Sequence, residues 1–241
     1  MDPLPLFGLA FAALVIGAIA WAWYSAAAAA KRREGLATFA LREGLEFSVE
    51  DPLGLLWHPF HLLSRGDGRG VENVVHGTWK DIPLAAFDFW FYDETTDSKG
   101  GRHRTYQRFS CALGEVDAAL GSLVIGRESV FTRLADAVGL DDISFESDEF
   151  NRTFEVRCDD RRFASAFVDP RMMAWLLAAD RRLSFATGGR WLLVSAPRQP
   201  VEAVPGLLAS LREFHARMPR VIPDLFPLTP PPAGSGAGAG G

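Results

Sequence analysis

The hydrophobic pattern separates one continuous apolar segment near the N-terminus from a longer region of shorter patterns. Leu4–Tyr24 contains no charged residue, and Trp21, Trp23 and Tyr24 near its end are typical of an aromatic belt at a membrane surface. As a helix, a segment of this length covers about 31 Å, which is the thickness of the hydrocarbon core of a bilayer. We therefore expect a transmembrane helix that contacts the lipid bilayer through residues 4–24.

Charged residues flank this segment unequally. The basic cluster Lys31–Arg33 follows it, whereas Asp2 is the charged side chain that precedes it. The positive-inside rule then predicts a single-pass protein of the cell membrane with the N-terminus outside and the main domain in the cytoplasm. A cleaved signal peptide in front of a secreted domain is the alternative, because Ala26–Ala30 resembles a small-residue cleavage site. A signal peptide would, however, carry basic residues before its apolar segment.

The first part of the remaining chain alternates between apolar and polar residues, as strands do. The helix is expected to continue through Glu34–Arg42 and to end at Gly44. A tight turn is predicted at Gly66–Gly70, and a polar loop at Glu94–Gly101. The predicted strands are Glu46–Glu50, Phe60–Leu63, Val71–Trp79, Pro83–Tyr92 and His103–Ala112, of which the third and fourth form an antiparallel pair joined by Lys80–Ile82.

The second part mixes helical and strand periodicity. Helices are predicted at Glu128–Val138, after the cap Asp169 and its following Pro170, and at Val204–Met218. A strand is predicted at Asn151–Cys158. A hairpin is predicted from Leu183–Thr187 and Arg190–Ala196, because Gly188-Gly189 between them is a strong two-residue turn signal.

These elements predict an α+β fold: one N-terminal transmembrane helix, then an antiparallel-sheet domain with three or four helices packed on one side or end. We expect an anchor with its basic cap at residues 1–33 and a globular domain at residues 34–228. The domain is β-rich over 45–125 and mixed over 126–222. Residues 229–241, rich in Pro, Gly and Ala, are expected to be disordered.

Composition narrows the classes of partner. The chain is 48% hydrophobic with a mean hydropathy of +0.05, an average of the apolar segment and a domain of ordinary composition. Residues 34–241 carry 22 basic and 29 acidic side chains, a net charge of −7, so a nucleic acid is not an expected partner. Cys111 and Cys158 are expected to be reduced, small core residues, or one disulfide if the domain is exported.

Candidate chemistry is sparse. His58, His61 and His76 could supply a metal, but Pro59 prevents a regular helix through the first two and no ligand pair has zinc-site spacing; His103 and His215 are isolated. The acidic clusters at residues 93–97 and 141–149 lack the pattern of a calcium loop and are expected to be solvated loops. The glycine run at residues 66–70 lacks the lysine and helix of a phosphate-binding loop. We therefore assign no catalytic, cofactor-binding or metal-binding residue, and no cofactor.

Asp88 is the most informative single position. Period two places Asp88 and Trp90 on one face of the strand and Phe87 and Phe89 on the other, so the strand is expected to be central and buried on both faces. A buried carboxylate costs several kcal/mol unless it is paired, so an arginine or a tyrosine hydroxyl is the expected partner. A catalytic acid is the alternative, but no second carboxylate or base can be assigned to it.

The layout resembles that of uncharacterised single-span bacterial membrane proteins with a β-rich cytoplasmic domain. The matching pieces are Gly77–Tyr92 with Phe87–Tyr92 as its kernel, the Phe150–Cys158 strand, and the Leu183–Val194 hairpin, and the resemblance covers most of residues 35–220. This group is one of unknown function, so the resemblance implies a topology and brings no activity.

Two classes of function remain. The first is a non-catalytic interaction or scaffold module, tethered to the membrane and bound to a protein partner of unknown identity. The second is a membrane-anchored enzyme that uses Asp88 or the histidines; a secreted domain behind a signal peptide is a further alternative. A concave pocket that gathers Asp88, a histidine and an arginine would favour the enzyme. A closed sheet with an exposed apolar patch or an unpaired edge would favour the interaction module.

Overall fold

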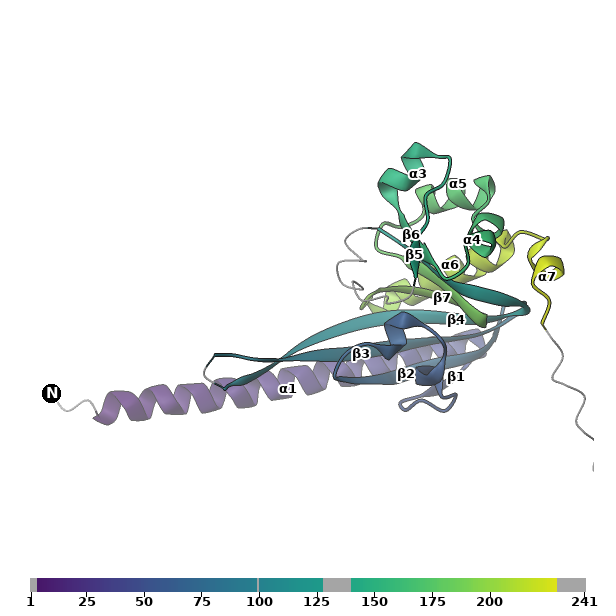
Figure 1. Ribbon diagram of the computed structural model, residues 1–241. Coiled ribbons are helices and arrows are strands. Elements are labelled where there is room, and N and C mark those ends of the chain that lie inside the picture. The colour runs from purple at the N-terminus through teal and green to yellow at the C-terminus, as the bar shows by residue number, and fades with distance from the viewer. Residues whose placement is uncertain (1–3, 99, 128–139, 229–241) are drawn as a thin grey trace, which may run out of the picture.

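The computed structural model of the protein describes residues 4–98, 100–127 and 140–228. Its described part is α+β: a long N-terminal helix, an antiparallel sheet of seven strands, and several shorter helices (Figure 1). This confirms the predicted fold class. The predicted helix at residues 128–138 and the predicted tail at residues 229–241 lie outside the described residues.

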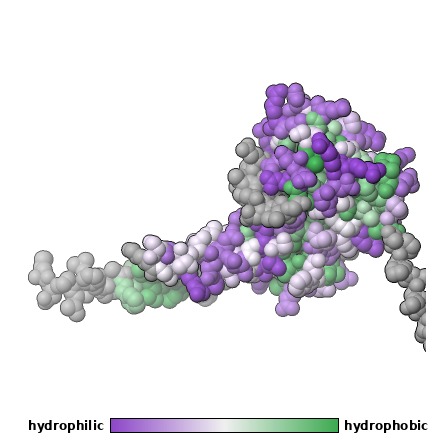
Figure 2. Space-filling view, viewed as in Figure 1, coloured by the Kyte–Doolittle hydropathy of each residue, from purple (hydrophilic) through white to green (hydrophobic). Residues whose placement is uncertain are grey.

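Helix α1 (Leu4–Glu43) is one continuous helix of 40 residues that projects well beyond the rest of the molecule (Figure 1). The apolar segment therefore continues into the domain without a break, and the helix ends just before Gly44, as expected. From Phe11 onwards the helix is long and apolar enough to cross a membrane. None of its most apolar stretch is buried inside the molecule. Figure 2 shows a hydrophobic surface along the first described side chains of α1, while the outer end of the domain is mostly hydrophilic.

Four strands that follow one another along the chain form an antiparallel meander, which includes the pair predicted at residues 71–79 and 83–92. They are β1 (Glu46–Ser48), β2 (Gly68–Trp79), β3 (Ile82–Thr96) and β4 (Arg102–Gly126). Lys80 and Asp81 form the two-residue turn between β2 and β3, and both have positive φ angles, of 48° and 69°. A turn of this kind matches the right-handed twist of the strands it joins.

The second part of the chain completes the sheet around β4. Its strands are β5 (Asp141–Asp142), β6 (Glu155–Cys158) and β7 (Ser184–Pro197). The strand order is β1-β2-β3-β4-β6-β5, and β7 pairs with β4 along its other edge. Strand β4 has 25 residues and pairs with β3 over its first half and with β6 near its end. It is therefore the strand that joins the two parts of the domain.

Short helices follow the strands. The α-helices are α3 (Asp148–Thr153), α4 (Arg161–Phe167), α5 (Pro170–Ala178), α6 (Val204–Arg217) and α7 (Ile222–Leu225); the 3-10 helices are η1 (Leu55–Trp57), η2 (His61–Ser64) and η3 (Val201–Ala203). The predicted start of α5 is confirmed, because Asp169 accepts a hydrogen bond from the Met172 backbone N–H and Pro170 occupies the first turn. The predicted last helix is confirmed as α6.

Three local predictions are wrong. Residues 61–63 belong to the 3-10 helix η2 in place of a strand, and Phe60 directly precedes it. Residues 151–153 belong to α3, so the strand predicted at residues 151–158 shortens to β6. The two acidic clusters are not simply loops, because residues 93–96 belong to β3 and Asp141–Asp142 pairs with β6 as strand β5. Short apolar runs fit a strand and a 3-10 helix equally well, and long-range pairing decides between them.

The predicted hairpin at Gly188-Gly189 is also wrong. Residues 184–197 form one strand, β7, which pairs with β4 from end to end across two register shifts. Gly189 has a φ of +63°, so it provides an irregularity in a continuous strand, as glycine does in β-bulges. Pairing with the long strand β4 therefore replaces the local turn.

The sheet is buried on both faces by two separate hydrophobic clusters. One cluster joins α1, α4, α5 and α6 to one face, and its residues from α1 are Leu36, Phe39 and Ala40. The other lies beneath η1 and η2 and contains Leu55, Leu62 and Leu63 together with the phenylalanines of β3. The α-helices of the domain thus cover one face, as predicted, and α1 is part of that covering layer.

Candidate functional site: the buried ion pair beneath the anchor helix

Asp88 lies in the middle of β3, between β2 and β4, and only 4% of its surface is exposed. Its neighbours Phe87 and Phe89 belong to the cluster beneath η1 and η2, whereas Ala86 belongs to the cluster beneath α1. The prediction of a central strand buried on both faces is therefore confirmed. The carboxylate faces the layer that contains α1 and α6.

The partner of Asp88 is Arg32, from the basic cluster that follows the apolar segment. Arg32 Nε donates to Asp88 Oδ2 and Arg32 Nη2 to Asp88 Oδ1, each at 2.6 Å, and the two side chains are 10% and 5% exposed. Two parallel charge-assisted hydrogen bonds of this kind are the strongest pairing available to a carboxylate in a protein. The sequence-based expectation of an arginine partner is confirmed, and the arginine comes from the anchor helix.

Three polar residues from other segments complete the site. Arg32 Nη1 donates to the Gln199 backbone oxygen at 2.6 Å, and Arg32 Nη2 reaches Ser110 Oγ at 3.2 Å. Asn73 Nδ2 donates to Asp88 Oδ2 at 3.0 Å; Asn73 has a φ of 56° and lies at the β-bulge of β2. The pair is thus held by α1, β2, β3, β4 and the segment after β7.

A second arginine, Arg198, also lies close to the Asp88 carboxylate. Arg198 Nη2 lies 3.5 Å from Asp88 Oδ2 and 4.0 Å from a Glu72 oxygen. Partial burial lowers the pKa of Arg198 below its ordinary value, and the negative charge of Asp88 opposes this shift. Two arginines therefore share one buried carboxylate, with Glu72 supplying further negative charge at the rim.

The cavity beside this pair is too small for a substrate. Its volume is about 10 Å³, and its lining includes Arg32, Leu36, Asn73, Asp88, Ser110, Cys111 and Leu207. A space of this size holds one water molecule at most. No histidine is among the described residues that line it, so the arrangement that would favour an Asp88 enzyme is not found here. The geometry of this site serves to join α1 to the sheet.

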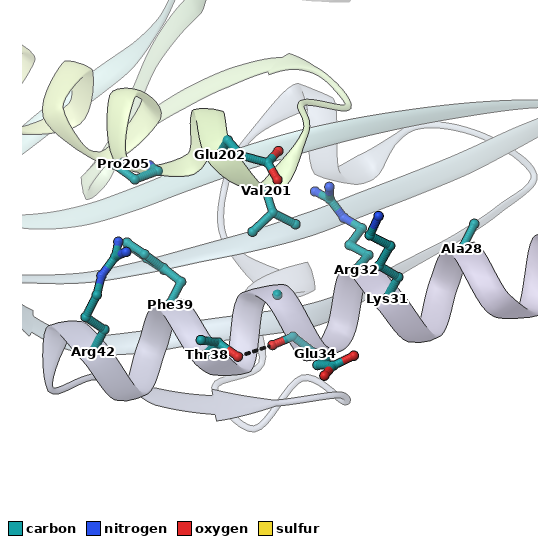
Figure 3. A pocket seen from close by; sticks show the side chains of 11 residues that line it. Ala28, Lys31, Arg32, Glu34, Thr38, Phe39, Arg42, Val201, Glu202 and Pro205 are labelled. Carbon is teal, nitrogen blue, oxygen red and sulfur yellow. Dashed lines mark hydrogen bonds between the residues drawn. The ribbon is translucent and has the colours of Figure 1, made fainter.

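A larger groove of about 810 Å³ lies along the same helix (Figure 3). It runs between α1 and the segment formed by η3 and the start of α6, and Val201 points across it toward α1. Its charged lining residues are Lys31, Arg32, Glu34, Arg42 and Glu202. Because the Arg32 guanidinium is engaged by Asp88, two basic and two acidic side chains remain. The charge of the groove therefore favours neither anions nor cations.

The histidines that the sequence raised as candidates lie on separate elements. They are His58 after η1, His61 in η2, His76 in β2, His103 in β4 and His215 in α6. The ring of His58 packs edge-on against Trp191, with 4.5 Å between ring centroids. Within the described residues, no group of three or more His, Cys, Asp or Glu side chains lies together in a way that could hold a metal ion.

Both cysteines are free and buried. Cys111 belongs to the cluster beneath η1 and η2, and Cys158 to the cluster on the other face of the sheet. Burial raises the pKa of both thiols, that of Cys158 to about 11. Thiols in this state are poor nucleophiles, in agreement with the expectation that they act as small core residues.

The role of Arg32 is what sequence reasoning missed. The cluster Lys31–Arg33 was explained as a topology signal, which needs no individual partner for any of its members. Lys31 and Arg33 are indeed exposed. A signal was nevertheless present: Arg32, Leu36, Phe39 and Ala40 are spaced as one helical face, so the arginine lies on the same side as the residues that pack on the sheet.

No family model matches the chain, and no curated protein matches it in sequence. A solved structure that resembles it is the crystal structure of the mycobacterial trehalose monomycolate transport factor A, TtfA. The TM-score is 0.57 at 17% sequence identity, and the alignment covers 83% of this chain and 97% of that chain. At this identity the similarity concerns the fold alone. This chain therefore shares its fold with a mycobacterial transport factor.

Proposed function

We propose that the protein is a non-catalytic accessory module of a membrane assembly. Helix α1 anchors it in the bilayer, and the α+β domain is held in a fixed orientation at the membrane surface, so that the protein can bind an integral membrane component that also contacts α1 within the bilayer. The observation that carries this proposal is the buried pair between Arg32 and Asp88, which joins the anchor helix directly to the central strand. An anchor attached in this way transmits its position in the membrane to the whole domain.

The energetics of the pair support an orienting role. Desolvation of two charges offsets much of their attraction, so a buried ion pair adds little net stability compared with apolar residues of the same size. Such a pair does, however, strongly favour one alignment, because any other leaves a buried charge without its partner. We infer that Arg32 and Asp88 select the position of α1 along the sheet.

The fold similarity supports a transport-related assembly. TtfA is a mycobacterial trehalose monomycolate transport factor. By analogy of fold, the component that this protein binds would belong to a transport system of the membrane. This is the same class of function as the interaction module expected from the sequence, and it needs no reactive group in the domain.

For orientation, we propose an N-terminus outside the cell and a cytoplasmic domain. Lys31 and Arg33 remain exposed just beyond the apolar segment and support this orientation, whereas the charge of Arg32 is paired. A green fluorescent protein fused to the C-terminus should be bright. A dark fusion, together with an active periplasmic alkaline phosphatase fusion at the same point, would contradict the cytoplasmic placement.

The interaction itself is tested by site-specific photo-crosslinking of the full chain in living cells. A benzophenone amino acid at Leu14, which is 74% exposed on α1, should capture a discrete integral membrane protein. The matched control carries the same probe at Glu149, an exposed residue of α3 at the far end of the domain. If Leu14 yields only lipid adducts or only copies of this chain, or if both positions capture the same products, the accessory role is contradicted.

A further inference from the structure

The β3–β4 hairpin extends beyond the rest of the sheet, in the direction of the N-terminal end of α1 (Figure 1). Two contacts define how α1 lies along β3. Arg32 binds Asp88, and Glu43 Oε2 accepts a hydrogen bond from Trp79 Nε1 at 2.9 Å, at the level where Trp79 pairs with Ile82. Between these contacts α1 covers about 16 Å and β3 about 20 Å, so the helix and the strand run nearly in line.

The rise per residue of the helix and of the strand also gives the relative positions of residues closer to the membrane. From Arg32 back to Tyr24, α1 covers about 12 Å. From Asp88 onward, Tyr92 lies about 13 Å along β3 and Thr96, at the end of the strand, about 26 Å. Tyr92 is therefore level with Tyr24, where the apolar segment ends, and the tip of the hairpin passes that level by about 10–14 Å.

The hairpin carries an aromatic cluster at the level of Tyr24. Trp90, Tyr92 and Tyr106 lie on the Asp88 face, and their ring centroids are 5.2–6.5 Å apart. Tyr106 is 51% exposed. Tyrosine and tryptophan at this level are the residues that proteins place at a membrane surface, where one end of the ring is apolar and the other wet.

Glycines on the neighbouring strand make room for these rings. A Cβ atom on Gly68 would collide with the Tyr92 ring, and one on Gly70 would lie 2.8 Å from the Trp90 ring. The glycine run at residues 66–70, which the sequence suggested was only a turn, thus lets two aromatic rings pack closely against β2. The rings are fixed in place, so the exposed aromatic face is a built surface.

Charges of both signs lie near the tip, and several of them pair within the hairpin. Glu94 pairs with Arg104 at 2.9 Å and with Arg102 at 3.4 Å, and His103 Nε2 lies 3.3 Å from Asp97 Oδ2. Residues 93–104 contain three acidic and three basic residues apart from His103. Such a tip can enter the polar headgroup layer, whereas in the hydrocarbon core its charges would be costly.

We propose that the β3–β4 hairpin is a second membrane contact, which rests on the lipid headgroups with its aromatic face toward the bilayer. This inference rests on the proposed function, because it requires α1 to span the membrane. If α1 stood upright, the tip would reach hydrocarbon depth. A tilt of about 20–40°, within the range of transmembrane helices, lifts the tip into the headgroups and turns the Asp88 face of the hairpin toward the lipid. The hairpin thereby sets the tilt of the anchor.

The test measures depth in phosphatidylcholine nanodiscs that contain the full-length protein. A bimane label is attached to Thr96→Cys, on the aromatic face of the hairpin, and to Thr95→Cys, on the opposite face. Asp148→Cys in α3 is the remote control, and Trp21→Cys reports on the span. The native cysteines are buried and should stay unlabelled in the folded protein. Fluorescence is compared with and without spin-labelled lipid, labelled at the headgroup for the domain sites and in the acyl chain for Trp21→Cys.

The label at Thr96→Cys should be quenched severalfold more strongly than that at Asp148→Cys, and more strongly than that at Thr95→Cys. Equal quenching at residues 96 and 148 would overturn the second contact, and equal quenching at residues 95 and 96 would overturn the aromatic face as the contacting surface. Trp21→Cys separates this failure from that of the proposed function. If its label is not quenched from the acyl chains, α1 does not span the bilayer and the anchoring itself is wrong.

Discussion

The two halves of α1 follow opposite rules of burial. In the half that begins the described side chains, the apolar residues Phe11, Leu14, Trp21 and Trp23 are all more than 70% exposed. In the half that lies on the sheet, Leu36, Phe39 and Ala40 are buried, and the charged side chain of Arg32 is only 10% exposed. One helix thus exposes apolar groups at one end and buries a charge at the other.

The difference shows that the two halves are adapted to different surroundings. Single exposed apolar residues are common on proteins, but a whole exposed apolar helix indicates surroundings other than water. A buried charge indicates a defined partner of opposite charge. The first half is suited to lipid, and the second is part of the folded domain. Because the helix is continuous, contacts that hold the second half on the sheet also set the direction of the first half relative to the domain.

The largest expected effect is on the buried half. Asp88→Ala leaves Arg32 and Arg198 without their carboxylate and should lower the free energy of unfolding by about 3–5 kcal/mol. Thermal and chemical unfolding of the full-length protein in detergent measures this loss. The double variant Arg32→Met/Asp88→Leu should recover much of it, because the charge of Arg32 is removed with its partner and the more exposed Arg198 still has Glu72 beside it. An unchanged melting temperature for Asp88→Ala would contradict the structural role of the pair.

A matched pair of substitutions should separate the two halves. Leu14→Arg places a charge in the middle of the apolar segment and should cost about 3 kcal/mol of insertion, while the domain keeps its melting temperature. Leu36→Arg places the same charge in the core, so it should lower the melting temperature without releasing the protein from membranes. Alkaline extraction of membranes and thermal unfolding measure the two effects. The comparison fails if both variants show the same combination of defects.

A smaller effect is expected for the hairpin beside the exposed half. Gly68→Ala pushes against the ring of Tyr92 and should lower the free energy of unfolding by about 1–3 kcal/mol, the usual cost of overpacking. Gly206→Ala is the control, because no atom lies within 4 Å of the added Cβ on α6. That change should be neutral or slightly stabilising in a helix. Equal melting temperatures for the two variants would argue against the close packing of glycine and tyrosine.

The smallest effect concerns pH and should appear only in the domain. Burial lowers the pKa of His215, so the folded state binds a proton less readily than the unfolded state. Stability should therefore fall as pH drops below the ordinary histidine value of about 6.5. Melting temperatures at pH 7.5 and 5.5 should differ less in His215→Gln than in the wild type. Membrane extraction should not change, because residues 4–23 contain no titratable side chain; an equal pH dependence in both proteins would contradict this assignment.

Local patterns predicted the elements whose causes are local. The continuous helix, the β2–β3 hairpin, the cap of α5 and the stripe of α6 depend on periodicity and on residues next to one another in the chain. The failures were elements that depend on distant partners. Gly188-Gly189 has the composition of a turn, but pairing with β4 keeps β7 one continuous strand. Residues 60–63 have the composition of a strand, but Phe60, Leu62 and Leu63 pack into the hydrophobic cluster on one face of the sheet and pair with none of its described strands.

In the candidate site, too, some features followed from local sequence and others depended on distant segments. Alternation along β3 was enough to place Asp88 in a buried central strand and to require a cationic partner, because burial of a carboxylate has a large cost. Which of the many arginines met that need depended on where α1 lies on the sheet, 56 residues away in sequence from Asp88. The same is true of Gln199 and Ser110, which reach the site from distant segments.

By itself, the sequence determined that an apolar segment of membrane-spanning length precedes an acidic α+β domain, because length, hydropathy and periodicity are properties of the chain alone. Only the tertiary structure decided that the two form one body. It did so by placing Arg32 over Asp88, a contact between segments that no local pattern relates. The physical reason is the cost of an unpaired buried charge, which allows α1 and β3 to pack in a single alignment.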